Sequence, residues 1–190
     1  MDQMASSVGG FVAIDFKDVD SPIIDKIETD FNNFGHALCI VDTKGDHADL
    51  TPDYAAIPAE MKAVAEHFSV EYLRQICRED VMLNIDILRG EFGDRAVLRS
   101  LHFFDENDRV DRLVHALKTE DFDAFLDSIR ESGNSSYKYL QNVFSSNDIK
   151  NQGLGIGLNV AESVLKRKGA CRVHGGGFAG TIQAFVPTEM

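Results

Sequence analysis

The sequence predicts a single α+β domain in which antiparallel strands pack on helices, and three observations indicate this class. Strand-like segments come first, segments with helical periodicity fill the middle, and strand-like segments return at the end of the chain. A length of 190 residues suits one domain. Because no repeat or proline-rich linker divides the sequence, we expect one domain over residues 1–190.

The first part of the chain is predicted to hold a helix end and two strands. Residues 1–7 are typical of the end of a helix, since a pair of glycines follows them. Residues 11–16 are short, β-branched and aromatic, which predicts a strand. Residues 36–43 form an apolar run too short for a good helix, so we expect a strand buried on both faces. The polar stretch 17–35 predicts no element.

The middle of the chain is predicted to be helical. One helix is expected over Ile57–Phe68, with Pro58 tolerated in its first turn. Asp94 follows a glycine and fits the N-cap of a long helix. The glycine and asparagine at 133–134 predict a break. The other helical segments are 122–132, 136–144 and 154–168. Two strands, 170–174 and 181–187, then end the chain.

Composition and charge narrow the class of function. Hydrophobic residues make up 44% and charged residues 26%, as in ordinary globular proteins. A net charge of −12 disfavours nucleic acid and anionic membrane surfaces as partners. No apolar run approaches the ~18 residues of a membrane span, and no secretory signal is apparent, so we expect a cytoplasmic protein. Three widely spaced cysteines indicate neither a disulfide framework nor a metal site.

The most unusual local feature is the glycine-rich segment 174–180, between the two final strands. Glycine permits positive φ and leaves no Cβ in the way, so such a backbone can point N–H groups at a phosphate or a sugar hydroxyl. The spacing matches neither of the common nucleotide-binding fingerprints, GxxxxGK[ST] and GxGxxG. A glycine hairpin without a ligand remains an open alternative.

The segment GACRVHGGGFAGTIQAFVP (169–187) resembles the third conserved motif of the GHMP kinases. In that family a glycine-rich turn near the C-terminus closes over the active site. The resemblance implies a C-terminal GHMP-kinase domain, with ferredoxin-like βα layers and extra helices. It also implies substrate-binding roles for His174, Gly175, Gly176 and Gly177.

Three further segments resemble galactokinase within that family. The opening MDQ, followed by ASSVGG, is similar to a segment whose aspartate faces the anomeric hydroxyl of the sugar. The resemblance makes Asp2 the candidate catalytic residue, since a carboxylate in reach of the attacking hydroxyl can accept its proton. The stretch 39–54 is similar to a family loop whose tyrosine, here Tyr54, contacts galactose. The run RSLH at 99–102, with Glu106 and Arg109, resembles a family helix and is interpreted as structural.

The sequence departs from the family at places that bear on the substrate. Asp42 and Lys44 stand where the family loop has asparagines, and segment 152–162 differs from the family sequence. These changes leave the phosphoryl-transfer class unaffected. They leave the identity of the sugar substrate open: it is galactose or a related sugar, including an N-acetylated or deoxygenated one.

The resemblance also implies parts that this sequence lacks. The family's ATP-binding loop precedes the MDQ segment, and no such segment occurs here. The resemblance therefore implies ATP and Mg²⁺ as cofactors of a longer parent protein. We expect the chain alone to lack kinase activity and to expose an apolar face, covered by the missing N-terminal half or by a homodimer contact. The alternative is a non-catalytic, galactokinase-like module that binds a sugar or regulates a partner.

Overall fold

The computed structural model describes residues 2–18, 20–45 and 50–190 and includes Asp2 without its side chain. In the N-terminal part, the helices and strands are α1 (Asp2–Val8), β1 (Phe11–Asp15), β2 (Ile23–Ile27), the 3₁₀ turn η1 (Phe31–Phe34) and β3 (His36–Asp42). The helical middle comprises α2 (Thr51–His67), the 3₁₀ turn η2 (Leu73–Gln75), α3 (Arg78–Leu83), α4 (Ile85–Phe92), α5 (Asp94–Lys118), α6 (Phe122–Ser135) and the π turn η3 (Ser136–Leu140). The chain ends with α7 (Gly153–Leu165), β4 (Ala170–Val173) and β5 (Thr181–Pro187).

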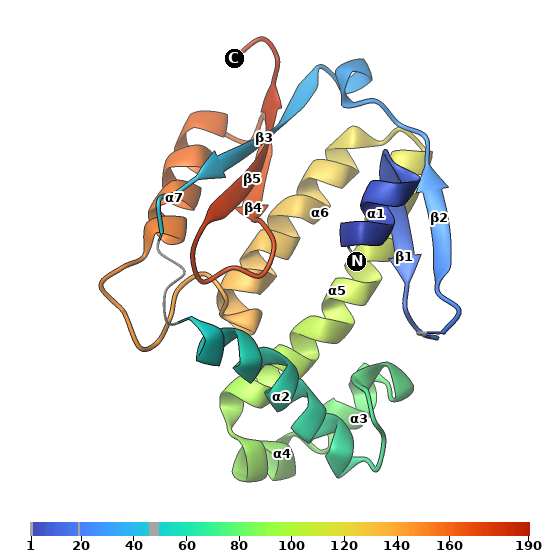
Figure 1. Ribbon diagram of the computed structural model, residues 1–190, viewed down its shortest axis with the longest axis vertical. Coiled ribbons are helices and arrows are strands. Elements are labelled where there is room, and N and C mark those ends of the chain that lie inside the picture. Colours follow the sequence, from blue (N-terminus) through green and yellow to red (C-terminus); the bar gives the residue numbers. More distant parts are fainter. Residues whose placement is uncertain (1, 19, 46–49) are drawn as a thin grey trace.

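Two antiparallel sheets organise these elements. Strands β1 and β2 form a hairpin, and a separate sheet has the order β3–β5–β4. Helix α7 lies on one side of that sheet, and α6 and α5 lie on the other (Figure 1). Helices α2, α3 and α4 pack around the N-terminal half of α5 (Figure 1). The arrangement confirms the predicted α+β class with antiparallel strands packed on helices.

The core follows from the alternation of side chains along β5. Phe185 points toward α6 and packs edge-on to Phe31 and Phe125, with ring centroids 5.3 and 5.0 Å apart. Its neighbours Ile182 and Ala184 point to the opposite face and pack under α7. A second core among α2, α4 and α5 includes the fully buried Val64 of α2 and Leu88 of α4. Both faces of the sheet are therefore packed along β5, the central strand.

Several predicted boundaries are wrong for identifiable reasons. Helix α2 begins at Thr51, so Pro58 lies inside it rather than in its first turn. Asp94 is the first residue of α5, and its carboxylate accepts from Arg89 instead of capping the helix. Helix α6 continues through Gly133, where a Cβ would lie 3.1 Å from the Cβ of Arg172. That glycine permits close packing on β4 and does not break the helix.

Strand β3 is correctly located, but its predicted burial is wrong. It is an edge strand of the sheet and most of its residues are exposed. Leu38 and Ile40 keep 45% and 51% of their surface accessible. An apolar run with both faces buried and an apolar edge strand give the same sequence pattern, so the sequence could not distinguish them. The stretch 17–35, for which no element was predicted, contains β2 and η1.

Candidate functional site

The candidate site is built around the glycine loop, residues 174–180, which joins β4 to β5 and extends toward α2 (Figure 1). The loop is closed at its base, where the His174 backbone N–H donates to the Thr181 carbonyl at 3.0 Å. The Nδ1 atom of His174 also lies 3.0 Å from the Thr181 hydroxyl oxygen. The two strands thus fix both ends of the loop.

The second half of the loop is anchored to α2 and to the segment after the π turn. The Tyr54 hydroxyl donates to the Gly177 carbonyl at 2.7 Å, and its ring packs edge-on to Phe178. The Asn142 side-chain amide donates to the Gly176 carbonyl at 3.1 Å, and its backbone carbonyl accepts from the Phe178 N–H. Burial raises the pKa of Tyr54, so its hydroxyl stays protonated and keeps this donor role at neutral pH.

Each of the three consecutive glycines meets a different environment. Gly177 has φ +84°, and a Cβ there would lie 2.0 Å from the Asn142 carbonyl oxygen. A Cβ on Gly176 would lie 2.7 Å from the Tyr54 ring. Gly175 has φ +68° but no atom within 4 Å of its ideal Cβ position. The chain packing therefore requires glycine at 176 and 177, whereas only the backbone conformation favours it at 175.

The tip of the loop is exposed to solvent. His174, Gly175 and Gly176 are exposed, whereas the residues from Gly177 to Gly180 are buried. Within the described part of the chain, the N–H groups of Gly175 and Gly176 donate to no other residue. Two adjacent N–H donors on exposed residues are suited to an anionic or hydroxyl-rich ligand.

The segment after β3 supports the loop from its other side. Thr43 donates to the Gly180 carbonyl through both its backbone N–H (2.8 Å) and its hydroxyl (2.7 Å). The side chains on either side of it, Asp42 and Lys44, form an exposed ion pair at 2.8 Å. Lys44 has φ +60°, a conformation that asparagine tolerates better than lysine. The two departures from the galactokinase pattern thus contact each other next to the loop.

The structure brings Tyr54 together with the glycine loop, as the family pattern implied for one site. Of the predicted residues, Gly176 and Gly177 contact Tyr54 directly, and His174 and Gly175 form the exposed side of the same loop. Asp2 begins α1, but its side chain lies outside the described structure. The roles of these residues in binding or catalysis stay predictions.

Sequence reasoning missed two polar residues that hold the site together. Asn142 is buried at the exit of the π turn, within a segment expected to be helical. Asp53, next to Tyr54, is buried and accepts from the Ser145 hydroxyl at 2.6 Å. No motif marks either residue. The single available signal was the position of Asp53 beside the candidate tyrosine.

A buried ionic cluster lies between α5, α6 and β4, away from the exposed tip. Glu106 contacts Arg109 and accepts from Ser132, and Arg172 of β4 lies 3.3 Å from it. Arg172 also donates to Ser132 at 2.5 Å. His102, one turn before Glu106 on α5, has its Nδ1 atom 2.8 Å from the Ser135 hydroxyl. These contacts agree with the structural interpretation of the α5 motif, although His102 hydrogen-bonds to Ser135 rather than to Glu106.

Electrostatics in this cluster favour a charged Glu106 and a neutral His102. Burial lowers the pKa of His102, Glu106 opposes this by raising it, and Arg109 and Arg172 add to the lowering. Burial alone would raise the pKa of Glu106, but the Ser132 hydrogen bond and the two arginines lower it below its usual value. Burial also lowers the pKa of Arg172, opposed by Glu106. The carboxylate therefore serves as the counter-charge that allows β4 to carry a partly buried arginine.

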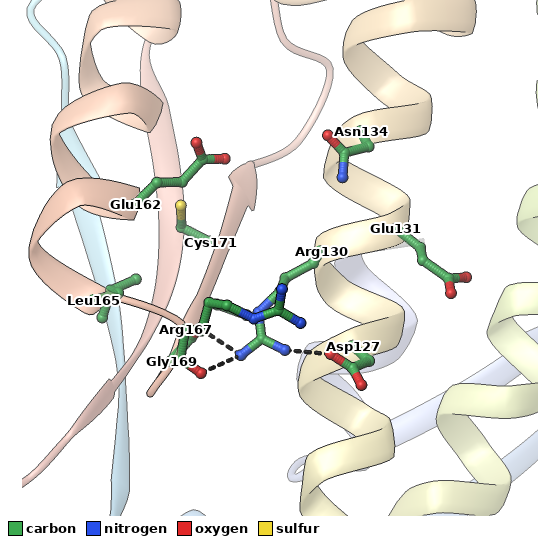
Figure 2. A pocket seen from close by; sticks show the side chains of 10 residues that line it. Asp127, Arg130, Glu131, Asn134, Glu162, Leu165, Arg167, Gly169 and Cys171 are labelled. Carbon is green, nitrogen blue, oxygen red and sulfur yellow. Dashed lines mark hydrogen bonds and ion pairs between the residues drawn. The ribbon is translucent and has the colours of Figure 1, made fainter.

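A polar hollow of about 510 Å³ lies between α6 and α7, beside the start of β4 (Figure 2). Figure 2 shows Arg130 reaching across it, and its guanidinium contacts Asp127 and donates to the Arg167 and Gly169 carbonyls at 2.7 and 2.8 Å. The hollow adjoins Gly169 and Ala170, whereas the glycine loop follows the other end of β4. Arg130 thus anchors the turn between α7 and β4. The hollow does not extend the candidate site.

Neither a membrane-spanning helix nor a cluster of metal ligands occurs among the residues that the structure describes. None of their helices is both long and apolar enough to cross a membrane. Across the same ranges, no three His, Cys, Asp or Glu side chains are grouped so as to hold a metal ion.

Comparison with known proteins finds a resemblance to galactokinases, as the motifs did. A galactokinase of Glaesserella parasuis is 26% identical over 195 residues, covering 100% of this chain and 46% of the relative. A galactokinase of Haemophilus influenzae is 27% identical over 153 residues, covering 80% of this chain and 38% of the relative. The chain resembles galactokinases over its full length. No protein-family model matches it.

The fold agrees with this resemblance. The crystal structure of Lactococcus lactis galactokinase complexed with galactose matches with a TM-score of 0.68 at 18% identity, over 89% of this chain and 41% of that protein. The predicted resemblance to a galactokinase portion with the GHMP-kinase fold is thereby confirmed. The chain spans less than half the length of the galactokinases that it matches.

Proposed function

We propose that this chain is the substrate-facing part of a galactokinase-like sugar kinase. The complete protein would transfer the γ-phosphate of ATP to the anomeric hydroxyl of galactose or a related sugar. The observation that carries the proposal is the glycine-loop tip. Gly175 and Gly176 are exposed there, their N–H groups have no partner among the described residues, and Tyr54 and Asn142 hold the loop in place. The full-length similarity to galactokinases supports the same reaction class.

Phosphoryl transfer requires positioning and charge stabilisation more than covalent participation by the protein. The exposed N–H groups of Gly175 and Gly176 fit an anionic ligand such as the γ-phosphate, and Tyr54 borders the same loop. Asp2 is the proposed base for the sugar hydroxyl. ATP with Mg²⁺, when bound, supplies the phosphoryl group, and its other contacts would come from the part of a galactokinase that this chain does not span.

The proposal is tested by comparing the chain alone with the same chain joined to the preceding half of a galactokinase. The chain alone, given ATP, Mg²⁺ and galactose, is expected to release no ADP above background. The joined protein is expected to form the sugar 1-phosphate. Replacing Asp2 by asparagine in the joined protein should lower kcat by about 10²–10⁴-fold. Asp108→Asn, an exposed change on α5, is the matched control and should leave kcat unchanged.

Three results would contradict the proposal. Turnover by the chain alone would show that it needs no second half. A joined protein that folds and binds sugar without phosphorylating it would favour the non-catalytic module instead. Full activity of the Asp2→Asn protein would remove Asp2 from the mechanism. Binding of galactose is measured as a rise in the unfolding temperature, because a ligand that binds the folded state stabilises it by mass action.

A further inference from the structure

We propose that a second copy of this chain docks on the free edge of β3, so that the sheets of two copies join through antiparallel β3 strands. The proposal does not depend on the sugar-kinase function. It arises from an edge strand that is apolar on both of its faces. Leu38 and Ile40 are exposed on the face shared with Phe185, and Val41 is exposed on the face toward α7.

The backbone of β3 has its hydrogen-bonding groups oriented for such pairing. In the antiparallel register with β5, Thr43 donates to the Gly180 carbonyl, and Thr188 donates to the Gly35 carbonyl. Hydrogen-bonded residues alternate along an antiparallel strand. The odd-numbered residues of β3 therefore bond to β5, and the N–H and C=O groups of Leu38 and Ile40 point away from the sheet. Neither of these two residues is a lysine or a proline, which commonly protect an edge strand.

The sequence of β3 is suited to pairing with itself. A twofold axis at Cys39 pairs every residue of His36–Asp42 with a residue of the second copy. In that register Leu38 lies opposite Ile40 and Ala37 lies opposite Val41, so apolar side chains meet apolar side chains. Asp42, which is paired with Lys44 in its own chain, lies opposite His36, so no two carboxylates meet. The outward-pointing groups of Leu38 and Ile40 become the hydrogen-bonded pairs.

An apolar groove adjoins this edge. It has a volume of about 500 Å³ and lies between β3 and α7, with Cys39 and Val41 on one side and Ile156, Val160 and Val164 on the other. Ile156 and Val160 leave 67% and 56% of their surface exposed. A second copy paired on β3 would cover this apolar surface, because the groove is continuous with the free edge. Removal of such surface from water favours association.

The register makes a specific prediction for Cys39, which is a free thiol. In the proposed dimer it faces its own counterpart in a non-hydrogen-bonded pair, where the two Cα atoms are about 4.5 Å apart. That separation is within the range that a disulfide spans. Mild oxidation by copper–phenanthroline and oxygen removes two protons and two electrons from the two thiols and joins the copies.

The experiment uses the full chain with Cys77, an exposed thiol, replaced by serine. Serine is a good N-cap and suits the start of α3, where Cys77 stands. We expect a noncovalent dimer by analytical ultracentrifugation and a covalent dimer after oxidation. The additional change Cys39→Ser should abolish the covalent species and keep the noncovalent one. Ile40→Lys should weaken dimerisation by at least about tenfold, because an unpaired ammonium is costly to bury.

Leu83→Lys is the matched control, since Leu83 is 85% exposed on α3, away from β3. It should leave the dimer unchanged. A chain that stays monomeric at every concentration overturns the proposal, and so does a dimer that Ile40→Lys leaves intact. If the other half of a longer kinase covers β3 instead, the joined protein described above is monomeric and forms no Cys39 disulfide, which also overturns it.

Discussion

The glycine loop and the buried ionic cluster use polar groups in opposite ways. At the loop, backbone carbonyls are bound from behind by Tyr54 and Asn142, and exposed N–H groups remain at the tip. In the cluster, Glu106 and Arg172 are bound to each other and to Ser132, with little exposure to solvent. The first arrangement leaves hydrogen-bonding capacity for a ligand, whereas the second uses it within the fold.

The two regions are connected through β4. Arg172 lies in β4, and His174 begins the loop at the end of that strand. The cluster therefore fixes the strand that carries the loop to α5 and α6. The motif residues of α5 therefore support the candidate site through the fold, without contributing to its exposed surface. Changes in the cluster should reduce stability most, and changes in the loop should act more locally.

The largest effect is expected from Glu106→Gln, which keeps the side-chain shape and removes the charge. The buried Arg109 would then keep only its longer, 3.8 Å contact with Glu131, and the partly buried Arg172 would lose the Glu106 charge. Breaking a buried ion pair costs about 3–5 kcal/mol. Urea unfolding measures the loss. The matched control is Glu66→Gln, which removes an exposed i,i+4 pair with Lys62 and should cost less than about 0.5 kcal/mol. Equal losses for the two variants would contradict a structural role for the cluster.

An intermediate effect is expected from Gly177→Ala. The added Cβ would meet the Asn142 carbonyl oxygen at 2.0 Å in a residue whose φ is +84°. Left-handed strain and overpacking together should cost roughly 2–5 kcal/mol. Gly175→Ala is the matched control, because its φ is also positive but its Cβ position is open. It should cost only about 1–2 kcal/mol.

The loop variants are compared by thermal unfolding and by hydrogen exchange of the Phe178 amide, which donates to the Asn142 carbonyl. Faster exchange in Gly177→Ala, with near-normal exchange in Gly175→Ala, would locate the damage at the anchor. Similar exchange in the two variants would contradict the distinction between the anchored half and the free tip.

Sequence reasoning predicted the fold class and the loop because both depend on local patterns. Strand and helix periodicities are local, and consecutive glycines are visible without a structure. The motif resemblance placed Tyr54 in the same site as the loop, and the 2.7 Å hydrogen bond to Gly177 agrees with that proximity. The motif could not show that the Tyr54 hydroxyl donates its hydrogen bond to the loop itself.

The misplaced predictions share one physical cause, which is tertiary packing. Gly133, followed by an asparagine, is typical of a helix break. Its missing side chain instead lets α6 approach Arg172 on β4. The apolar run of β3 suggested burial, although the strand lies at the edge of the sheet. Asn142 anchors the loop through a hydrogen bond to Gly176, which is distant in sequence. None of these contacts leaves a periodic signal in the sequence.

The smallest of the three effects is expected from pH, and it concerns His102. Its pKa in the folded chain lies below the ordinary value of 6.5 because of burial. As the pH falls through 6.5, the unfolded chain takes up a proton before the folded chain does, so stability declines. Between pH 7.5 and 5.5 Glu106 adds nothing to this decline. Its pKa is lowered below 4.5, and its contribution is lost only at lower pH.

His102→Gln should therefore flatten the change in unfolding free energy between pH 7.5 and 5.5, measured in urea. His115→Gln, an exposed change on the same helix, should leave the slope as it is in the unaltered chain. A slope that survives His102→Gln would mean that protonation outside the cluster causes the acid sensitivity. A slope removed by it would show that the cluster behind the loop, rather than the exposed loop itself, makes the fold sensitive to acid.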